Sequence, residues 1–219
     1  MSELKTNRQK DAEEYRWNRY RQELEKAFPY PPAIYEPRMK VTPLALDGVK
    51  LISVDRYEDP RGSFTDHWHV EKFKDITGDF EFKQDCFVTS RDRVVRGLHY
   101  QVGEKEQGKL VRCVRGRIQD VIVDLRKSSK TFGQWINVYL SAEHHDIVWI
   151  PPGFAHGYST LYADADVLYK MTEVHSQKHE RTLLWNDPDL SIKWEAPKKP
   201  TLSIKDQQGT LFCNAELFE

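Results

Sequence analysis

Two short stretches that contain histidine are the parts of this 219-residue sequence best suited to chemistry. Residues 96–101 read RGLHYQ and include His99, and residues 151–158 read PPGFAHGY and include His156. An imidazole has an unperturbed pKa of about 6.5, so it can ligate a metal ion or move a proton near neutral pH. Two sites are therefore open: a metal centre that uses both histidines, or a metal-free pocket in which His99 carries a proton.

The metal centre is the weaker of these two interpretations. The P-x-G-x-x-H spacing of residues 151–156 resembles the second metal-binding motif of cupins, whose first motif supplies His-x-His and a later Glu. Here the first motif reads His99-Tyr100-Gln101, so its second histidine is absent. A zinc or iron site needs three or four converging nitrogen or oxygen ligands. Only the amide oxygen of Gln101 could replace the missing histidine ligand. We therefore expect that the protein binds no metal ion at this site.

The elements that must position these histidines are predicted to be short strands. From about Lys50 onward, runs such as VKLISVDRY, KLVRCVRGRIQDVIVDL and DIVWIP are rich in β-branched and aromatic residues. Eight or more such runs, separated by turn residues, indicate an all-β sandwich or barrel. We expect the chain to fold back at Arg115-Gly116 and to form a short helix at 70–77. A small barrel can hold one ligand in its mouth, so its inward-facing polar side chains are the candidates.

The first 45 residues have a different pattern of apolar residues and prolines from the rest of the sequence. Trp17, Tyr20, Leu24 and Phe28 recur every three or four residues, which predicts a charged helix with a narrow apolar stripe. Residues 29–37 then contain four prolines, which end a helix and favour an extended linker. We therefore divide the chain into a helical extension with a proline-rich linker, 1–45, and a β domain, 46–219.

The direction of the side chains in RGLHYQ is left open by the sequence. Strict alternation along a strand groups Leu98 with Arg96 and His99 with Gln101. Only an irregularity near Gly97 would bring Arg96 and His99 to one face.

Composition excludes several classes of protein. The 33 basic and 34 acidic residues nearly cancel, so charge gives no case for a nucleic acid or an anionic membrane as partner. No run approaches 18 apolar residues and the first residues lack the apolar core of a signal peptide, so we expect a cytoplasmic protein that does not span a membrane. Three widely spaced cysteines without a CxxC motif are typical of reduced thiols.

Seven motifs occur in an order that resembles the dTDP-4-dehydrorhamnose 3,5-epimerase family of the cupin superfamily. The resemblance covers about residues 48–212, and the motifs read DPRGSFTD, VVRGLHYQ, EQGKLVRCVRGRIQDVIVDLRKSSKTFGQWINVYLSAEH, VWIPPGFAHGYSTL, VLYKMTE, ERTLLWNDPDLSIKW and LSIKD. The resemblance implies a cupin-like jelly-roll barrel. It also implies a homodimer that acts on a nucleotide-linked 4-keto-6-deoxy sugar without metal or organic cofactor.

The resemblance also assigns roles to individual residues. The histidine base matches His99, its paired aspartate Asp206, the catalytic tyrosine Tyr169 and the active-site lysine Lys109. Implied contacts with the nucleotide sugar come from Arg96 at the diphosphate, Arg61 and Phe64 near the nucleotide, Asp66 (where the family commonly has Glu), Gln84 and His156.

The four catalytic types make chemical sense together. A proton beside a ketone is removed when a base lies close and the enolate oxygen is stabilised. His99 suits the first task and Asp206 would orient it and stabilise its cation. Lys109 is a compact positive charge for the oxyanion, and Tyr169 could return a proton from the opposite face, which inverts the carbon.

Departures from the family pattern lie where the base or the sugar would be recognised. Cys86 in QDCFVTS stands where the family usually has Asn, and Val174 and His175 replace tyrosines. Ser63 stands where an aromatic residue is common. We include His175 among the candidate binding residues, and we expect the chemistry to be retained while the substrate and the number of inverted centres stay open.

Several functions therefore remain in competition. The leading one is inversion of C3 and C5 of a dTDP-4-keto-6-deoxyhexose in the biosynthesis of deoxysugars and polysaccharides. Alternatives are an epimerase or ketoisomerase that acts at one centre or on a CDP- or GDP-sugar, a non-catalytic cupin that binds sugar nucleotides, and a metal-dependent cupin isomerase or oxygenase.

Overall fold

The computed structural model describes residues 39–219, so residues 1–38 of the predicted extension and linker, 1–45, lie outside this range. The first sheet has the strand order β1-β2-β10-β7-β12-β5, and the second has the order β13-β6-β11-β8-β9. The strands of the first sheet are β1 (Met39–Pro43), β2 (Lys50–Val54), β10 (Ile147–Ile150), β7 (Lys109–Arg115), β12 (Ala165–Met171) and β5 (Gln84–Ser90). Those of the second are β13 (Glu180–Thr182), β6 (Val95–Gln101), β11 (Phe154–Thr160), β8 (Arg117–Asp124) and β9 (Trp135–Ser141).

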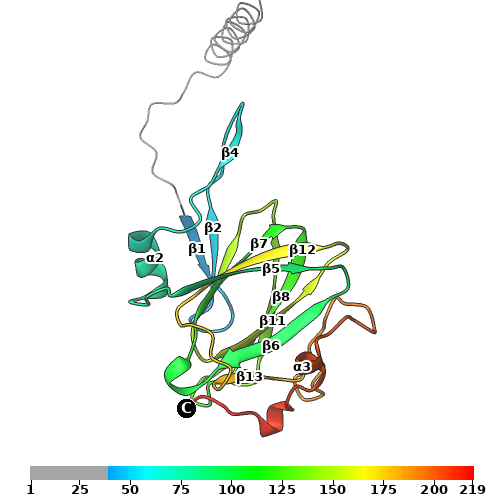
Figure 1. The fold of residues 1–219 in the computed structure, drawn as a ribbon. Coiled ribbons are helices and arrows are strands. Elements are labelled where there is room, and N and C mark those ends of the chain that lie inside the picture. The colour runs from blue at the N-terminus through cyan, green and yellow to red at the C-terminus, as the bar shows by residue number, and fades with distance from the viewer. Residues whose placement is uncertain (1–38) are drawn as a thin grey trace, which may run out of the picture. The chain divides into compact units, whose positions relative to one another are not determined.

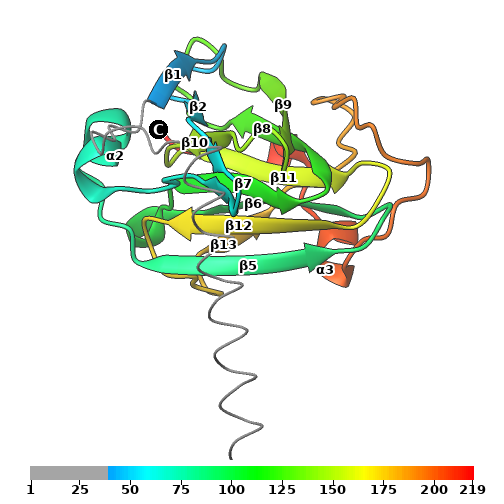
Figure 2. The ribbon, with the colours of Figure 1, turned by 90° about the horizontal axis from the view of Figure 1, so that it is seen from above.

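The helical elements are short and lie at the edges of the sheets. They are α2 (Val70–Thr77), α3 (Ile204–Gln207) and the 3₁₀ turns η1 (Gly103–Lys105) and η2 (Phe212–Asn214). Both views place α2 beside β1 and β2, and α3 near β6 (Figures 1 and 2). The predicted all-β fold with a short helix at 70–77 is confirmed. No helix within residues 39–219 is long and apolar enough to cross a membrane.

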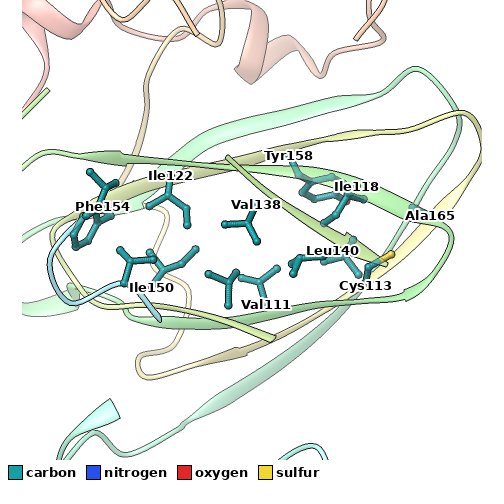
Figure 3. Close-up of a cluster of buried hydrophobic side chains, with 14 residues drawn as sticks. Val111, Cys113, Ile118, Ile122, Val138, Leu140, Ile150, Phe154, Tyr158 and Ala165 are labelled. Atoms are coloured by element: carbon teal, nitrogen blue, oxygen red, sulfur yellow. The ribbon is translucent and has the colours of Figure 1, made fainter. Parts of the chain in front are cut away.

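The main core fills the space between the two sheets. Val111, Val148 and Val167 of the first sheet belong to the same buried cluster as Ile118, Ile122 and Leu140 of the second. Figure 3 shows Val111 together with these three residues of the second sheet. Each of these six side chains is at most 1 % exposed. The residues next to them in each strand point to the opposite face of the sheet. Two layers of this kind form a jelly-roll sandwich, but their hydrogen-bond ladders stay separate, so the barrel is not closed.

Part of the outer face of each sheet is also covered. Phe73 and Ile76 of α2 pack on Leu110 and Trp149 of the first sheet. On the second sheet, the outward side chains of β6 and β8 pack against the C-terminal segment, which includes Phe212 and Phe218.

The turn predicted at Arg115-Gly116 is present, but it joins two different sheets instead of two paired strands. Gly116 has a φ of +76°, and a Cβ there would lie 2.3 Å from the carbonyl oxygen of Asp164. The turn exists, but β7 and β8 do not pair with each other across it. β7 belongs to the first sheet and β8 to the second, so the turn carries the chain from one layer to the other.

Residues 55–66 form a separate unit built around a small hairpin. Its strands are β3 (Tyr57–Asp59) and β4 (Gly62–Phe64), with Tyr57 opposite Phe64. Gly62, with a φ of +131°, follows the tight turn. The Asp59 carboxylate accepts from the backbone N–H of Arg61 at 2.8 Å, which stabilises the turn.

Candidate active site

A bulge in β6 decides which way its side chains point. In the pairing with β11, His99 lies opposite His156 and Arg96 opposite Tyr158, so two residues of β6 face Gly157 alone. Gly97 has a φ of +109°, and a Cβ there would lie 2.7 Å from the Cα of Gly157. The bulge brings Arg96 and His99 to the same face of β6, which is the arrangement that strict alternation would have prevented.

His99 is paired with Asp206, as the family pattern implies. The imidazole Nε2 lies 2.6 Å from Asp206 Oδ1, and Asp206 is 2 % exposed. Ser203, the N-cap of α3, donates to Asp206 Oδ2 at 2.7 Å and accepts from the Asp206 backbone N–H. This second pair of bonds holds the carboxylate in one orientation against the imidazole.

Burial changes the pKa values of both His99 and Asp206. It lowers the pKa of His99, and the hydrogen bond to Asp206 raises that pKa by a smaller amount, so the pKa of His99 stays below its ordinary value. Burial would raise the pKa of Asp206, but the hydrogen bonds from His99 and Ser203 outweigh it and the pKa falls. The resting pair is thus a neutral imidazole beside a carboxylate, which is the state of a general base.

Lys109 reaches across from the first sheet to β6. Its ammonium donates to the backbone carbonyl of His99 at 3.3 Å, and the residue is only 9 % exposed. Burial lowers its pKa to about 8, opposed by the carboxylates of Glu180 and Asp120. A buried cation beside the base can stabilise an oxyanion there.

Tyr169 faces the same space from the first sheet. It sits at the centre of β12, opposite Cys86 of β5 and Val111 of β7. Burial raises its pKa well above the ordinary value of 10, so the phenol is protonated at neutral pH. Its ring meets His156 edge-on, with the ring centroids 5.8 Å apart.

His156 forms a second histidine–carboxylate pair inside the sandwich. Its Nε2 lies 2.7 Å from Asp120 Oδ2, and the two side chains are 3 % and 0 % exposed. Within the described residues, Asp120 Oδ1 has no hydrogen-bond partner. Burial raises the pKa of Asp120, and His156 opposes the shift. The His156 imidazole is therefore held by a hydrogen bond to Asp120 and also packs edge-on against the ring of Tyr169.

Arg96, Gln84 and His175 line the rim of the cluster. Arg96 is exposed, and its Nε donates to Ser90 Oγ at 2.8 Å. Gln84 accepts from the backbone N–H of His175 at 2.7 Å and donates to Cys86 Sγ at 3.3 Å. The His175 imidazole lies 3.4 Å from Glu180. Arg96 is near enough to Tyr169 for its charge to lower the pKa of that phenol, and Glu180, the partner of His175, interacts with the charge of His99.

Three predicted binding residues belong to the separate unit of residues 55–66. Arg61 is bound to Asp59, with its Nε 3.1 Å from the carboxylate, and Phe64 ends β4 with 60 % of its surface exposed. Asp66 is the last residue of the unit. The described residues contain no group of three His, Cys, Asp or Glu side chains that could hold a metal ion.

Comparison with known proteins decides the family. Residues 43–214 match the pattern of the dTDP-4-dehydrorhamnose 3,5-epimerases. The dTDP-4-dehydrorhamnose 3,5-epimerase of Pseudomonas aeruginosa is 45 % identical over 181 residues, which cover 82 % of this chain and 99 % of that protein. The chain belongs to the dTDP-4-dehydrorhamnose 3,5-epimerase family.

Solved and curated relatives agree with this placement. The crystal structure of the dTDP-6-deoxy-D-glucose-3,5-epimerase of Legionella pneumophila, in complex with dTDP-4-keto-L-rhamnose, has a TM-score of 0.79 and 38 % identity and covers 82 % of this chain and 95 % of its own. A dTDP-4-dehydrorhamnose 3-epimerase of Streptomyces niveus is 34 % identical, over 81 % of this chain and 86 % of that protein. The predicted family, cupin-like jelly roll and isomerase class of this epimerase are confirmed.

Sequence reasoning missed several polar residues in the epimerase pocket. Asp120 interrupts the apolar run of β8, and that was the available signal, because a buried carboxylate needs a partner. Ser90 and Tyr158 carry no comparable signal, since a serine at a strand end and a tyrosine in a strand are ordinary. Their hydroxyls lie 2.7 Å apart in the interior.

Proposed function

We propose that this protein inverts C3 and C5 of a dTDP-linked 4-keto-6-deoxyglucose by proton transfers beside the C4 ketone. One observation supports this above the others: His99 with Asp206 faces inward from the second sheet, and Tyr169 faces inward from the first. A base and an acid on opposite walls of one space can remove a proton from one face of a carbon and return it to the other. That exchange inverts the centre.

The proposed reaction begins with His99 as the base. Its lowered pKa leaves the imidazole neutral at pH 7, so it can accept the proton next to the ketone. Asp206 then stabilises the imidazolium through the 2.6 Å contact. Electrons from the broken C–H bond move to the C4 oxygen and form an enolate.

Lys109 and Tyr169 complete the proposed reaction. Lys109, with a pKa of about 8, is mostly charged at pH 7 and would stabilise the enolate oxygen. Tyr169 would then donate its proton to the carbon from the opposite side. All steps are proton transfers, so the reaction needs no electron acceptor and we propose no cofactor.

Binding of the nucleotide is proposed for the rim residues. Arg96 presents a guanidinium suited to the diphosphate, and Gln84, His156 and His175 would contact the sugar or the base. Arg61, Phe64 and Asp66 are proposed to contact the nucleotide, as the family pattern implies. The dTDP-4-keto-L-rhamnose bound to the Legionella relative supports a dTDP-sugar as the substrate.

Inversion of one centre alone is the second candidate. The Streptomyces niveus relative is named a 3-epimerase, and Cys86 stands opposite Tyr169 where the family usually has a polar residue. A substitution beside Tyr169 can change how this acid reaches the sugar, so that only C3 or only C5 receives a proton on the face opposite His99.

We also propose a cytoplasmic homodimer. The three cysteines are free thiols, which are typical of a reducing compartment. Strand β5 ends the first sheet and carries Phe87 with 62 % of its surface exposed, an edge that a second copy would cover. Light scattering coupled to size exclusion tests the dimer.

Product analysis by NMR tests the reaction and the substrate. The protein is incubated in D₂O with the dTDP-, CDP- and GDP-linked 4-keto-6-deoxy sugars. We expect the dTDP sugar to gain deuterium at C3 and C5 with inversion at both. Deuterium at C3 alone would support the 3-epimerase, and no exchange with any sugar would contradict the proposed enzyme.

A further inference from the structure

The Arg96 side chain is held in place by two oxygens of the opposite sheet. Its Nε donates to Ser90 Oγ at 2.8 Å, and its Nη2 donates to the backbone carbonyl of Thr89 at 3.3 Å. Ser90 and Thr89 are the last two residues of β5 in the first sheet, whereas Arg96 belongs to β6 in the second. The two bonds therefore tie an exposed side chain of one sheet to the end of a strand in the other.

Ser90 is itself held by Tyr158. Tyr158 lies on β11 directly opposite Arg96, and paired residues of antiparallel strands point to the same face of their sheet. The Tyr158 hydroxyl lies 2.7 Å from Ser90 Oγ, and the two residues are 0 % and 1 % exposed. A serine hydroxyl has one proton and two lone pairs, so Ser90 can accept from Arg96 and still form a hydrogen bond with Tyr158. Ser90 therefore offers Arg96 an acceptor whose position is fixed in the core.

The groups that hold Arg96 carry no charge. Arg115 and Arg126, by contrast, are paired with the carboxylates of Asp166 and Asp124 at 2.6 and 2.8 Å. In the part of the chain that the structure describes, Arg96 has no such carboxylate partner, and its two bonds go to a hydroxyl and a carbonyl. Neutral acceptors orient a guanidinium without compensating its charge. The charge of Arg96 is thus left for an anion from outside the chain.

The two bonds also decide which edge of the guanidinium is free. The Nε–H and one N–H of Nη2 form one edge of this planar group, and they are the donors that Ser90 and Thr89 use. The end of the group keeps one N–H of Nη2 and those of Nη1. This end is the fork that can bind two oxygens of a phosphate. Arg96 is therefore oriented with its phosphate-binding end turned away from β5.

We propose that Ser90 is a positioning residue for nucleotide binding: supported by Tyr158, it fixes the Arg96 guanidinium so that its free end faces a diphosphate. The inference rests on the proposed function, in which Arg96 binds the diphosphate of the dTDP sugar. Ser90 contacts Arg96 and takes no part in the proton transfers. Its effect is to order a long side chain before the ligand arrives, which lowers the entropic cost of binding.

The test measures binding of dTDP and of thymidine to Ser90→Ala by titration calorimetry. We expect the Kd for dTDP to rise by about 10-fold, the scale of one hydrogen bond to a charged group. The affinity for thymidine, which has no phosphate, should not change. KM for the dTDP sugar should rise by a similar factor while kcat stays the same, because His99 and Tyr169 are unaltered. A merely structural role would weaken both ligands or lower kcat, and either result would overturn the proposal.

Two further variants separate this role from an effect on folding. Ser90→Ala leaves the buried Tyr158 hydroxyl without its partner, so Ser90→Ala combined with Tyr158→Phe removes both hydroxyls together. This double variant should show the same loss of dTDP affinity. Ser141→Ala is the matched control: Ser141 is 3 % exposed and also ends a strand, but it accepts from the backbone N–H of His144 at 3.3 Å. It should bind both ligands as the unaltered protein does.

Arg96→Ala separates the inference from the proposed function. It should weaken dTDP binding at least as much as Ser90→Ala, and combining the two should cause no further loss, because Ser90 acts only through Arg96. A further loss would contradict the inference. If Arg96→Ala weakens dTDP binding and neither Ser90→Ala nor the double variant with Tyr158→Phe does, the role of Ser90 is wrong and that of Arg96 stands. If Arg96→Ala leaves the dTDP affinity unchanged, the proposed role of Arg96 is wrong and the inference falls with it.

Discussion

Arg96 and His99 lie on the same face of β6, although they are three residues apart in a strand. The bulge opposite Gly157 supplies the extra residue that makes this possible. A cation suited to a diphosphate and a base suited to a sugar carbon therefore point into one space. The length of β6 between them sets the distance from nucleotide to reacting sugar in the proposed complex.

Gly97→Ala should remove this arrangement. The added Cβ would lie 2.7 Å from the Gly157 Cα, at a φ of +109° that disfavours any side chain. We expect a loss of roughly 1–3 kcal/mol in the free energy of unfolding and loss of epimerase activity, measured by urea denaturation and by NMR. Gly103→Ala is the control, because Gly103 also has a positive φ but has open space around its Cβ position. Equal activity in the two variants would contradict the role of the bulge.

Asp206→Asn should slow the reaction and shift the acidic limb of the pH profile of kcat/KM to lower pH. The carboxylate raises the pKa of His99 against the larger effect of burial, so its removal lowers that pKa further. The acidic limb of the kcat/KM profile, set by the His99 proton, should therefore move to lower pH. We expect kcat to fall by about 10²–10⁴-fold, as for loss of one acid–base partner. A profile whose limb moves to higher pH, or an unchanged kcat, would contradict the pairing.

Lys109 should set the alkaline limit of activity. Burial lowers its pKa to about 8, so the ammonium that stabilises the enolate is lost as the pH rises through that value. We expect kcat to decline above pH 8 and the decline to be absent in Lys109→Arg, whose charge persists. Lys109→Met should be nearly inactive at every pH. An alkaline limb that survives in Lys109→Arg would assign the titration to another group.

His67 should make the protein less stable in acid. Burial, with the nearby charges of Arg112 and His145, lowers its pKa from 6.5 to about 4. Between these values the unfolded chain binds a proton that the folded chain does not, so stability rises with pH there and is lost as the pH falls from 6.5 toward 4. His67→Gln should flatten that dependence in urea denaturation. His144→Gln, at an exposed histidine, should not, and an equal effect of both would contradict the prediction.

Much of the fold and part of the site follow from local sequence. Runs rich in valine, isoleucine and tyrosine predicted the strands, because these side chains suit a pleated and half-buried surface. The glycine at 116 predicted a turn but could not say that β7 and β8 join different sheets, since turn chemistry does not choose a pairing partner. Motif order predicted His99 and Asp206 as partners across 107 residues, and the structure places them 2.6 Å apart.

Other features of the site depend on contacts between distant strands. The shared face of Arg96 and His99 arises from the pairing of β6 with β11, and Gly97 alone does not specify it. Asp120 becomes a buried partner of His156 only when β8 lies beside β11. Tyr158 looks like an ordinary core residue in the sequence, and only the folded structure brings Ser90 against its hydroxyl. Pattern in one strand cannot predict such relationships.

The central claim is that His99 removes a proton beside a ketone, and solvent exchange tests it most directly. The unaltered protein and His99→Ala are incubated with dTDP-4-keto-6-deoxyglucose in D₂O, and deuterium at C3 and C5 is followed by NMR. We predict exchange at both carbons in the unaltered protein and a loss of at least about 10²-fold in His99→Ala. Exchange in His99→Ala at the unaltered rate would contradict this account.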